Sequence, residues 1–317
     1  MVRRRSQLIP WRVAGGVADE HANADQVVRE TGWVFNNETG AQLTLEDFVM
    51  SGNKEVNAYL RVFGMNEIDL EKLSVLEIGS GIGRMTSRLT HRFGTVIAAD
   101  VDATFLERCR ETVAKHGVIN RLRTAHVTDG HTVPLADHSV DAVFSYITLQ
   151  HCSHGDALSL TKESLRVTKP HGVVMLNYRT WVLADIFLQP TGALIRALWK
   201  TKIFGPWLAK QRVATRLGWQ ANRVATSDVL DVVRIEVGNA VDRIFLVAYG
   251  DAGTRGARDL ICAGADGYVG DDDTVDDVQR LRGSENGGDA ADADAIAAAG
   301  GAGGLRDLRA GDLALER

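Results

Sequence analysis

Residues 75–84 read VLEIGSGIGR. The apolar beginning of this stretch is typical of a buried strand, and the glycines that follow let the backbone turn tightly and approach a ligand before a helix begins. The free amide groups and the dipole at the start of such a helix favour an anionic group there. The same pattern also fits a plain turn between strand and helix, so the surrounding sequence must decide between a ligand loop and a simple turn.

Strand and helix patterns alternate on both sides of this loop, over residues 73–178. Alternation at this pace predicts βαβ units and a doubly wound parallel sheet with helices on both faces. Residues 234–240 and 242–250 add the pattern of a final antiparallel strand pair. The expected strands are 73–78, 95–100, 121–127, 140–147 and 172–178, and the expected helices between them are 83–93, 103–116 and 155–168.

Composition divides the chain into a body and a tail. Residues 251–317 contain 13 Gly, 14 Ala and 13 Asp, with 15 acidic against 7 basic residues and one aromatic residue. Such a segment has little apolar surface to offset the entropy of ordering, so we expect it to be mostly disordered, either solvated or bound to a basic partner. The expected units are a helical cover (1–72), a sheet domain (73–250) with an inserted cap (180–228), and the tail (251–317).

The sequence has few features that indicate a membrane or an oxidising compartment. No apolar run approaches the length of a transmembrane helix. The three cysteines, Cys109, Cys152 and Cys262, are too few and too scattered for a disulfide framework or a cysteine-based zinc site. These observations predict a soluble, cytoplasmic protein.

Acidic residues near the loop favour a particular ligand. The dinucleotide pattern G-x-G-x-x-G requires a glycine where Arg84 stands, and the carboxylate of Glu77 suits a cation better than a pyrophosphate. S-adenosylmethionine is cationic at its sulfur and its amino group. Asp100 ends the second strand, where a doubly wound fold places a carboxylate that accepts hydrogen bonds from ribose hydroxyls. Asp129, after the third strand, can accept a hydrogen bond from an adenine amino group.

Four ordered motifs resemble the class I S-adenosylmethionine-dependent methyltransferases. They cover about residues 50–180, and only Thr168 and His171 depart from the usual strand-five signature. The resemblance implies a mostly parallel, seven-stranded Rossmann-like sheet with an N-terminal helical cover and a substrate cap inserted after strand five. The motifs are VLEIGSGIGRMT (75–86), AADVDATFLERC (98–109), HVTDGHTVPLADHSVDAVFSYITLQH (126–151) and ESLRVTKPHGVVML (163–176).

The same resemblance implies roles for individual residues. Asp100 holds the ribose, Val101 packs on the adenine, and Thr128 and Asp129 face the adenine edge. Glu77 either supports the loop or touches the ligand. The residues implied around the methionine part of the cofactor are Gly79, Ser80, Gly81, Gly83, Ser145 and Tyr146.

His151 is the candidate catalytic base. Methyl transfer from a sulfonium is an in-line displacement that needs no metal, so positioning and removal of the acceptor's proton carry the catalysis. His151 follows the fourth strand, beside the expected position of the cofactor sulfur, and similar methyltransferases often have a histidine there. A histidine in this place can instead only brace the loop. We expect no metal site, since the other histidines lack ligand spacing with carboxylates.

The predicted cap is basic and rich in tryptophan. Residues 186–227 contain seven basic residues, no acidic residue and three tryptophans. This composition indicates an anionic acceptor, peripheral contact with an anionic membrane through residues 186–223, or an amphipathic helix pair with core tryptophans. We expect no nucleic-acid partner, because the rest of the chain is only weakly basic and has no recognition motif.

We therefore expect methyl transfer to an oxygen of a small or lipid-linked acceptor, such as a sugar or natural product. Nitrogen and carbon acceptors remain open, because the cofactor motifs carry no information on the acceptor atom. Two alternatives are a nicotinamide-dependent oxidoreductase, which the absence of a hydride-transfer residue pair disfavours, and a catalytically inactive partner subunit that binds S-adenosylmethionine.

Overall fold

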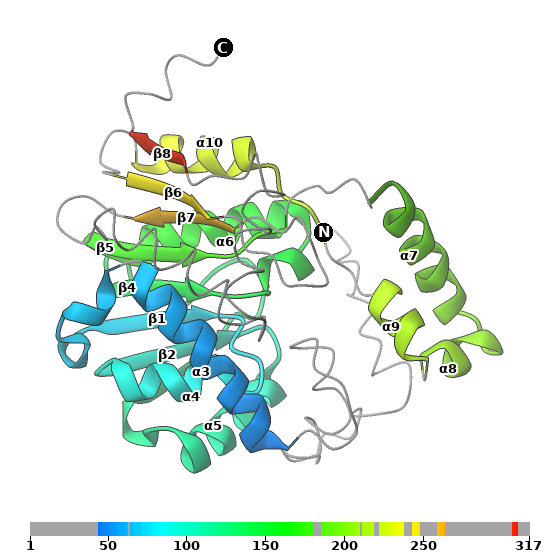
Figure 1. The fold of residues 1–317 in the computed structure, drawn as a ribbon, viewed down its shortest axis with the longest axis horizontal. Coiled ribbons are helices and arrows are strands. Elements are labelled where there is room, and N and C mark those ends of the chain that lie inside the picture. The colour runs from blue at the N-terminus through cyan, green and yellow to red at the C-terminus, as the bar shows by residue number, and fades with distance from the viewer. Residues whose placement is uncertain are drawn as a thin grey trace, which may run out of the picture.

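A parallel sheet of five strands carries the glycine loop (Figure 1). The computed structural model describes residues 44–62, 64–179, 185–209, 211–218, 222–237, 243–247, 259–263 and 306–309. The five strands run in the order β3-β2-β1-β4-β5, and each lies where the alternating pattern predicts it. Their bounds are β1 Ser74–Ile78, β2 Thr95–Asp100, β3 Leu122–His126, β4 Val140–Ser145 and β5 Thr168–Leu176.

Three antiparallel strands extend the sheet beyond β5. The order continues β7-β6-β8, with β6 Arg243–Val247, β7 Asp259–Ala263 and β8 Arg306–Arg309. The described residues thus form an eight-stranded sheet rather than the seven-stranded sheet expected. Two of the added strands, β7 and β8, lie within the tail. The rest of residues 251–317 lies outside the described residues, so the disorder expected there stays a prediction.

The expected strand at 234–240 is wrong in its first part. Residues 234–237 form the end of α10, Thr226–Val237, whose Val229 and Val233 are buried in the core. Val229 and Val233, four residues apart, share one face of the helix, and their packing in the core with residues of α6 outweighs the strand preference of the short apolar run that follows.

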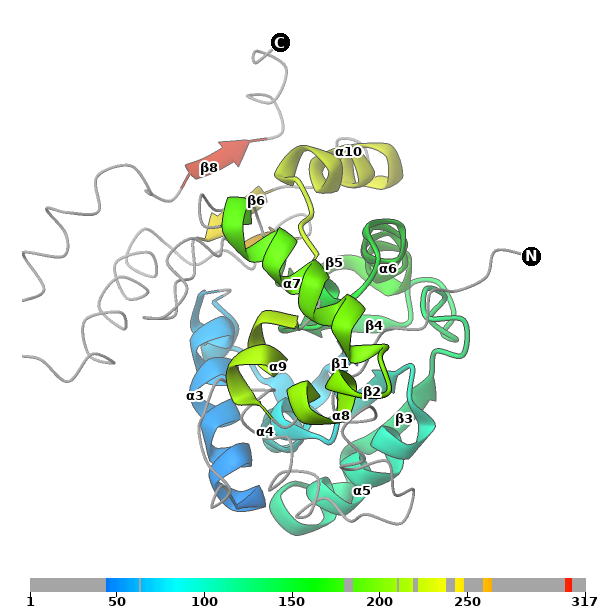
Figure 2. The ribbon, with the colours of Figure 1, turned by 90° about the vertical axis from the view of Figure 1, so that its right-hand side faces the viewer.

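Alternate strand residues face two helical layers. Leu76 and Ile78 pack with residues of α6, His154–Val167, and of α10. Val75 packs on the other side with residues of α3, Leu45–Val62, and α4, Arg84–Arg92. A third helix, α5, Ala103–His116, lies beside α4 against β2. The helices therefore cover both faces of the sheet, as predicted (Figure 2).

Only the last part of the predicted helical cover is described. Helix α3 lies where the sequence is most helical, and short 3-10 turns at Met65–Glu67 and Leu70–Lys72 lead from it into β1. Residues 1–43 lie outside the described part. Among the described residues, no helix combines the length and the apolar character that crossing a membrane requires.

Three helices lie within the segment after β5 for which a cap is predicted. They are α7 Asp185–Trp199, α8 Phe204–Ala209 and α9 Arg212–Gly218. The parallel strands end at the edge that we call the carboxyl edge of the sheet. Figure 2 looks onto this edge and shows α7, α8 and α9 in front of β1, β2 and β4. The three helices therefore stand over the end of the sheet at which the glycine loop lies.

The strand order also places a ligand site. The chain leaves β1 toward β2 and β3 on one side, and then returns to add β4 and β5 on the other side. In an open α/β sheet, ligands bind outside the carboxyl ends of the strands where the order reverses. Here that point lies between β1 and β4, so the residues after Ile78 and Ser145 are the first candidates for a site.

One departure from the family signature has a visible backbone consequence. His171 stands where the signature has a glycine, and its φ of 65° is left-handed. A left-handed conformation costs little for glycine and more for a residue with a Cβ atom. The turn within β5 thus keeps its shape without the glycine, at the edge of the sheet opposite the glycine loop.

Candidate functional site

The glycine loop turns sharply between β1 and α4. Gly79, Gly81 and Gly83 all have positive φ, at 77°, 54° and 94°. A Cβ atom added to Gly79 would lie 2.1 Å from Cγ2 of Thr148, whereas one added to Gly81 would meet nothing within 4 Å. Gly79 is therefore required by close packing, while Gly81 presents bare backbone to open space, as a ligand loop must.

Asp100 ties the second strand to this loop. Its Oδ2 accepts a hydrogen bond from the Gly81 amide at 2.9 Å, and its Oδ1 accepts one from the Asp102 amide at 2.9 Å. Burial raises the pKa of Asp100 to about 6, although these backbone hydrogen bonds act against the shift. The Val101 amide also donates to this carboxylate. The accepting capacity that remains is available to a further donor, and the bond to the ribose stays a prediction.

Glu77 lies beneath the loop. Its Oε2 accepts a hydrogen bond from Oγ1 of Thr86, in α4, at 2.6 Å, and the side chain is buried. Burial raises the pKa of Glu77 to about 7, against the opposing effects of Thr86 and Arg84. This geometry agrees with the loop-supporting role, and direct contact with a ligand stays a prediction.

The residues expected around the adenine lie at the ends of β2 and β3. Val101 is 54% exposed, which is unusual for valine and leaves an apolar surface beside Asp100. Asp129 is held by its own loop, since its Oδ1 accepts hydrogen bonds from the amides of His131 at 2.9 Å and Thr132 at 2.8 Å. Desolvation raises the pKa of Asp129, but hydrogen bonds from Thr132 and His131 outweigh it and bring this pKa down to about 2. Thr128 is exposed next to it.

The end of β4 contributes one buried and one half-buried side chain. Ser145 is buried, and its hydroxyl donates to the carbonyl of Ile78 at 2.9 Å, which ties β4 to β1 just before the loop. The ring of Tyr146 lies 5.6 Å from the guanidinium of Arg84 and 5.6 Å from the ring of Tyr59, in α3. Tyr146 thus joins the loop to the helical cover.

Arg84 is a site residue whose role the sequence does not reveal. It is buried, forms an ion pair with Glu55 of α3, and lies between the rings of Phe48 and Tyr146. In the sequence, Arg84 is distinctive only because it stands where the dinucleotide pattern requires a glycine. Its partners come from α3 and from the end of β4, each about 30 or more residues away in the chain, so no local signal could have identified them.

His151 lies close to the glycine loop through a strained turn. Ile147 has a φ of 59°, a costly conformation for a β-branched residue, and its amide donates to Oδ1 of Asn177 at 3.2 Å. The next residue, Thr148, donates its hydroxyl to the carbonyl of Gly79 at 3.3 Å. A 3-10 turn, Leu149–His151, follows directly and holds His151 half-buried.

The segment after the α7–α9 helices returns to this turn. The amide of Asn222 donates to the carbonyl of Gln150, and its side-chain amide donates to the carbonyl of Cys152. The amide of Val224 donates to the carbonyl of Arg179, just after β5. These contacts anchor the helical insertion beside His151, and the sequence contains no signal for them because they join residues that are distant in the chain.

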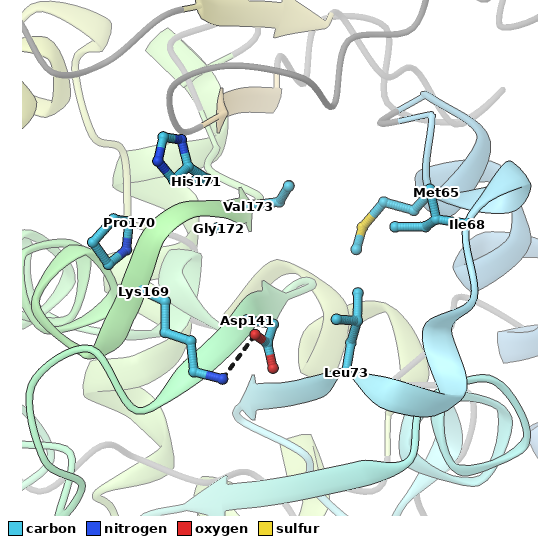
Figure 3. A pocket seen from close by; sticks show the side chains of 9 residues that line it. All are labelled: Met65, Ile68, Leu73, Asp141, Lys169, Pro170, His171, Gly172 and Val173. Atoms are coloured by element: carbon cyan, nitrogen blue, oxygen red, sulfur yellow. Dashed lines mark hydrogen bonds and ion pairs between the residues drawn. The ribbon is translucent and has the colours of Figure 1, made fainter.

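A hollow in the described surface lies away from these residues (Figure 3). It is found at the starts of β1, β4 and β5, and so at the edge opposite the glycine loop. Its charged groups satisfy one another, since Nζ of Lys169 lies 2.8 Å from Oδ1 of Asp141, whose Oδ2 accepts from Ser74. We therefore place the candidate site at the carboxyl edge. The hollow is lined by Met65, Ile68, Leu73, Asp141, Lys169, Pro170, His171, Gly172 and Val173.

The residues at the carboxyl edge fit S-adenosylmethionine. Gly81 leaves room for a ligand against the backbone, and Asp100 is a buried carboxylate with lone pairs to spare. The hydroxyl of Ser80 is buried at this edge, beside the thiol of Cys109 in α5. Glycine backbone, carboxylate and the exposed valine match the amino acid, ribose and adenine parts of the cofactor.

Fold and site together resemble those of a class I S-adenosylmethionine-dependent methyltransferase domain. Residues 76–176 match the family model described as a methyltransferase domain. Its cofactor is S-adenosylmethionine, as the sequence predicts.

Named relatives are methyltransferases of several kinds. Phosphoethanolamine N-methyltransferase 3 of Arabidopsis thaliana is 31% identical over 108 residues, which are 34% of this chain and 22% of the relative. Malonyl-[acyl-carrier protein] O-methyltransferase of Yersinia pestis is 27% identical over 154 residues, 48% of this chain and 52% of the relative. The chain thus spans about half or less of the length of the curated relatives that it matches.

Solved structures of methyltransferases are also similar to this chain. The crystal structure of magnesium protoporphyrin IX methyltransferase from Synechocystis PCC 6803, with bound SAH, aligns at a TM-score of 0.49 and 14% identity. The alignment covers 76% of this chain and 98% of that chain.

The buried Glu77 predicts how stability depends on pH. Because burial raises its pKa to about 7, the folded protein keeps this proton at pH values where the unfolded chain, with a pKa of about 4.3, has lost it. The free energy of unfolding therefore falls as pH rises between about 4.3 and 7, by at most about 1.4 kcal/mol per pH unit from this group. Glu77→Gln is expected to flatten that slope, and urea unfolding at several pH values measures it.

The difference between the pH slopes of the wild type and Glu77→Gln reports on the contribution of Glu77. Asp100 also has a raised pKa and its charge interacts with that of Glu77, so a pH-dependent contribution from Asp100 remains in both curves. Equal slopes for the wild type and Glu77→Gln would mean that Glu77 is ionised in the folded protein across this range.

Proposed function

We propose that this chain transfers a methyl group from S-adenosylmethionine to a hydroxyl oxygen of a small or lipid-linked acceptor, such as a sugar or natural product, with His151 as the base. The observation that carries the proposal is the position of the half-buried His151, three residues after Thr148, whose side chain hydrogen-bonds Gly79 in the cofactor loop. A base in this place can reach an acceptor bound over the loop.

Each residue of the site has a part in this reaction. Bound S-adenosylmethionine supplies an electrophilic methyl group on a sulfonium. Asp100 accepts the ribose hydroxyls, and the open space beside the Gly81 backbone takes the amino acid part. The ring of His151 would take the proton of the acceptor hydroxyl as the methyl group passes to that oxygen; the carbon–sulfur bond breaks, and its electron pair stays on the sulfur of the departing thioether. Helices α7–α9, anchored beside His151 through Asn222, cover the acceptor and exclude water.

The relatives support a second acceptor class. One named relative is an N-methyltransferase and another an O-methyltransferase, so the shared domain serves both kinds of acceptor atom. A nitrogen acceptor that is neutral when bound loses its proton after methyl transfer, and His151 would then be less important for the rate. An experiment on the role of His151 must therefore also identify the atom that receives the methyl group.

Calorimetry and an acceptor screen test the proposal. Titration of the purified chain with S-adenosylmethionine, and separately with NADH, is expected to show binding of the first only. Labelled S-adenosylmethionine is then offered with hydroxylated and with amine-bearing sugars and lipids, and the methylated atom is located by mass spectrometry. Binding of NADH alone would favour the oxidoreductase alternative. Binding of S-adenosylmethionine with no transfer to any acceptor would favour the inactive partner subunit.

A further inference from the structure

The helices α7–α9 have a small core of their own. Ile195, Trp199 and Ala214 are buried together, with Leu208 and Leu217 packed against them. The close packing requires glycine at the contact, since a Cβ atom on Gly218 would lie 2.4 Å from the ring of Trp199. This core accounts for one face of α7 and for the apolar residues that meet it.

A second apolar face of α7 has no such role. Six residues, spaced so that they share one side of the helix, are all exposed: Ile186, Phe187, Pro190, Ala193, Leu194 and Ala197. The side chains of Phe187 and Leu194 are 75% and 60% exposed. The outward face of a helix on a soluble domain is normally polar, so this face is built for something other than water.

More apolar residues are exposed just beyond α7. Ile203, Phe204 and Trp207, in and before α8, are 80%, 54% and 60% exposed. Together with the exposed apolar face of α7 we call these residues the α7–α8 surface. So many exposed large apolar residues within one short segment indicate an interaction site rather than ordinary surface.

Charge around this surface has one sign. Residues 186–227 contain no acidic residue, and the basic side chains of Lys200 and Lys202 are exposed between α7 and α8. Large apolar side chains, a tryptophan and lysines in one place match the chemistry of an anionic bilayer surface, where the apolar groups enter below the headgroups and the lysines meet phosphate. The cores of protein–protein interfaces, by contrast, are depleted of lysine.

We propose that the α7–α8 surface docks this protein on anionic membranes. The surface belongs to the helices that stand over the carboxyl edge of the sheet (Figure 2), so docking brings the cofactor loop and His151 close to the lipid. The proposal is independent of the reaction, because it rests only on exposed side chains and charge. It also gives a lipid-linked acceptor a direct route to the site.

Cosedimentation of the full chain with vesicles tests the docking. Vesicles of phosphatidylcholine with phosphatidylglycerol are expected to pellet the protein, and vesicles of phosphatidylcholine alone to pellet much less. The double variant Phe187→Glu/Leu194→Glu is expected to lower the partition coefficient by about tenfold or more, because it removes two inserted side chains and adds two repelled charges. The matched control is Ile235→Glu, which changes an equally exposed isoleucine on α10 and is expected to bind as the wild type does.

Two further measurements keep the test decisive. Binding of S-adenosylmethionine by the variants shows that the sheet domain is folded; if the double variant fails this check, Lys200→Glu/Lys202→Glu replaces it, with the same expected loss of vesicle binding. Sedimentation velocity measures self-association. Wild type that stays in the supernatant with anionic vesicles, or variants that pellet like the wild type, would overturn the proposal. Self-association that the double variant abolishes, without vesicle binding, would assign the surface to a second copy of the chain.

Discussion

Replacing His151 with alanine is expected to lower turnover by about 10²–10⁴-fold and to leave the affinity for S-adenosylmethionine unchanged, because a positioned general base contributes about this much. The ring lies beyond the cofactor loop rather than in it, in the turn that Thr148 holds against Gly79. Steady-state transfer of a labelled methyl group gives the turnover, and calorimetry gives the affinity.

The neighbouring His154 provides a matched control. Its Nε2 lies 3.2 Å from Oδ2 of Asp228, which joins the start of α6 to the start of α10, and it has no place in the proposed reaction. His154→Ala is therefore expected to keep the turnover of the wild type. A His151→Ala variant at full rate would show that His151 only braces the turn. A loss of cofactor affinity in that variant would show that the turn itself had moved.

The core of the fold could be predicted because its signals are local. Each of the first five strands is a short apolar run, and helices with apolar residues at helical spacing follow β1, β2 and β4. Such patterns can be recognised without any knowledge of the residues that they contact. The wrong or missing predictions concern segments whose structure depends on contacts with distant residues. Residues 234–237 are helical because Val229 and Val233 pack against the sheet, and β7 pairs with β5 across some 85 residues of chain.

The residues of the candidate site likewise fall into those that the sequence predicts and those that it does not. The glycines and Asp100 could be identified because the turn and the strand end impose residue types at fixed spacing, and the structure brings them together through the hydrogen bond from Gly81 to Asp100. The partners of Arg84 and the anchoring of the His151 turn by Asn222 could not be identified. Both depend on contacts between segments that are distant in the chain, and neither requires a distinctive residue pattern at its own position.

Asp100→Asn is expected to weaken the binding of S-adenosylmethionine by about 1.5–3 kcal/mol, or roughly 10–150-fold in Kd, because the ribose hydroxyls lose a charged acceptor. The substitution preserves size, but the single amide oxygen can accept only one of the two hydrogen bonds that the carboxylate receives from the Gly81 and Asp102 amides. The melting temperature of the variant without cofactor measures the resulting cost to the loop, so the change in affinity is assigned to the ligand only where that temperature is close to the wild-type value. Asp102→Asn is the control, since Asp102 caps α5 through the amide of Thr104 and asparagine caps equally well.

The dependence of this affinity on pH adds a second readout for Asp100. Burial raises the pKa of its carboxyl to about 6 in the protein without cofactor, and hydroxyl donors bind the ionised form better than the protonated form. The affinity of the wild type is therefore expected to fall as pH falls through about 6, whereas Asp100→Asn has no charge to lose there and its Kd should stay flatter. Calorimetric titrations between pH 5 and 8 measure both curves, at about the same protein concentration. An unchanged Kd in Asp100→Asn would separate the ribose from this carboxylate and leave Asp100 as a support for the Gly81 backbone alone.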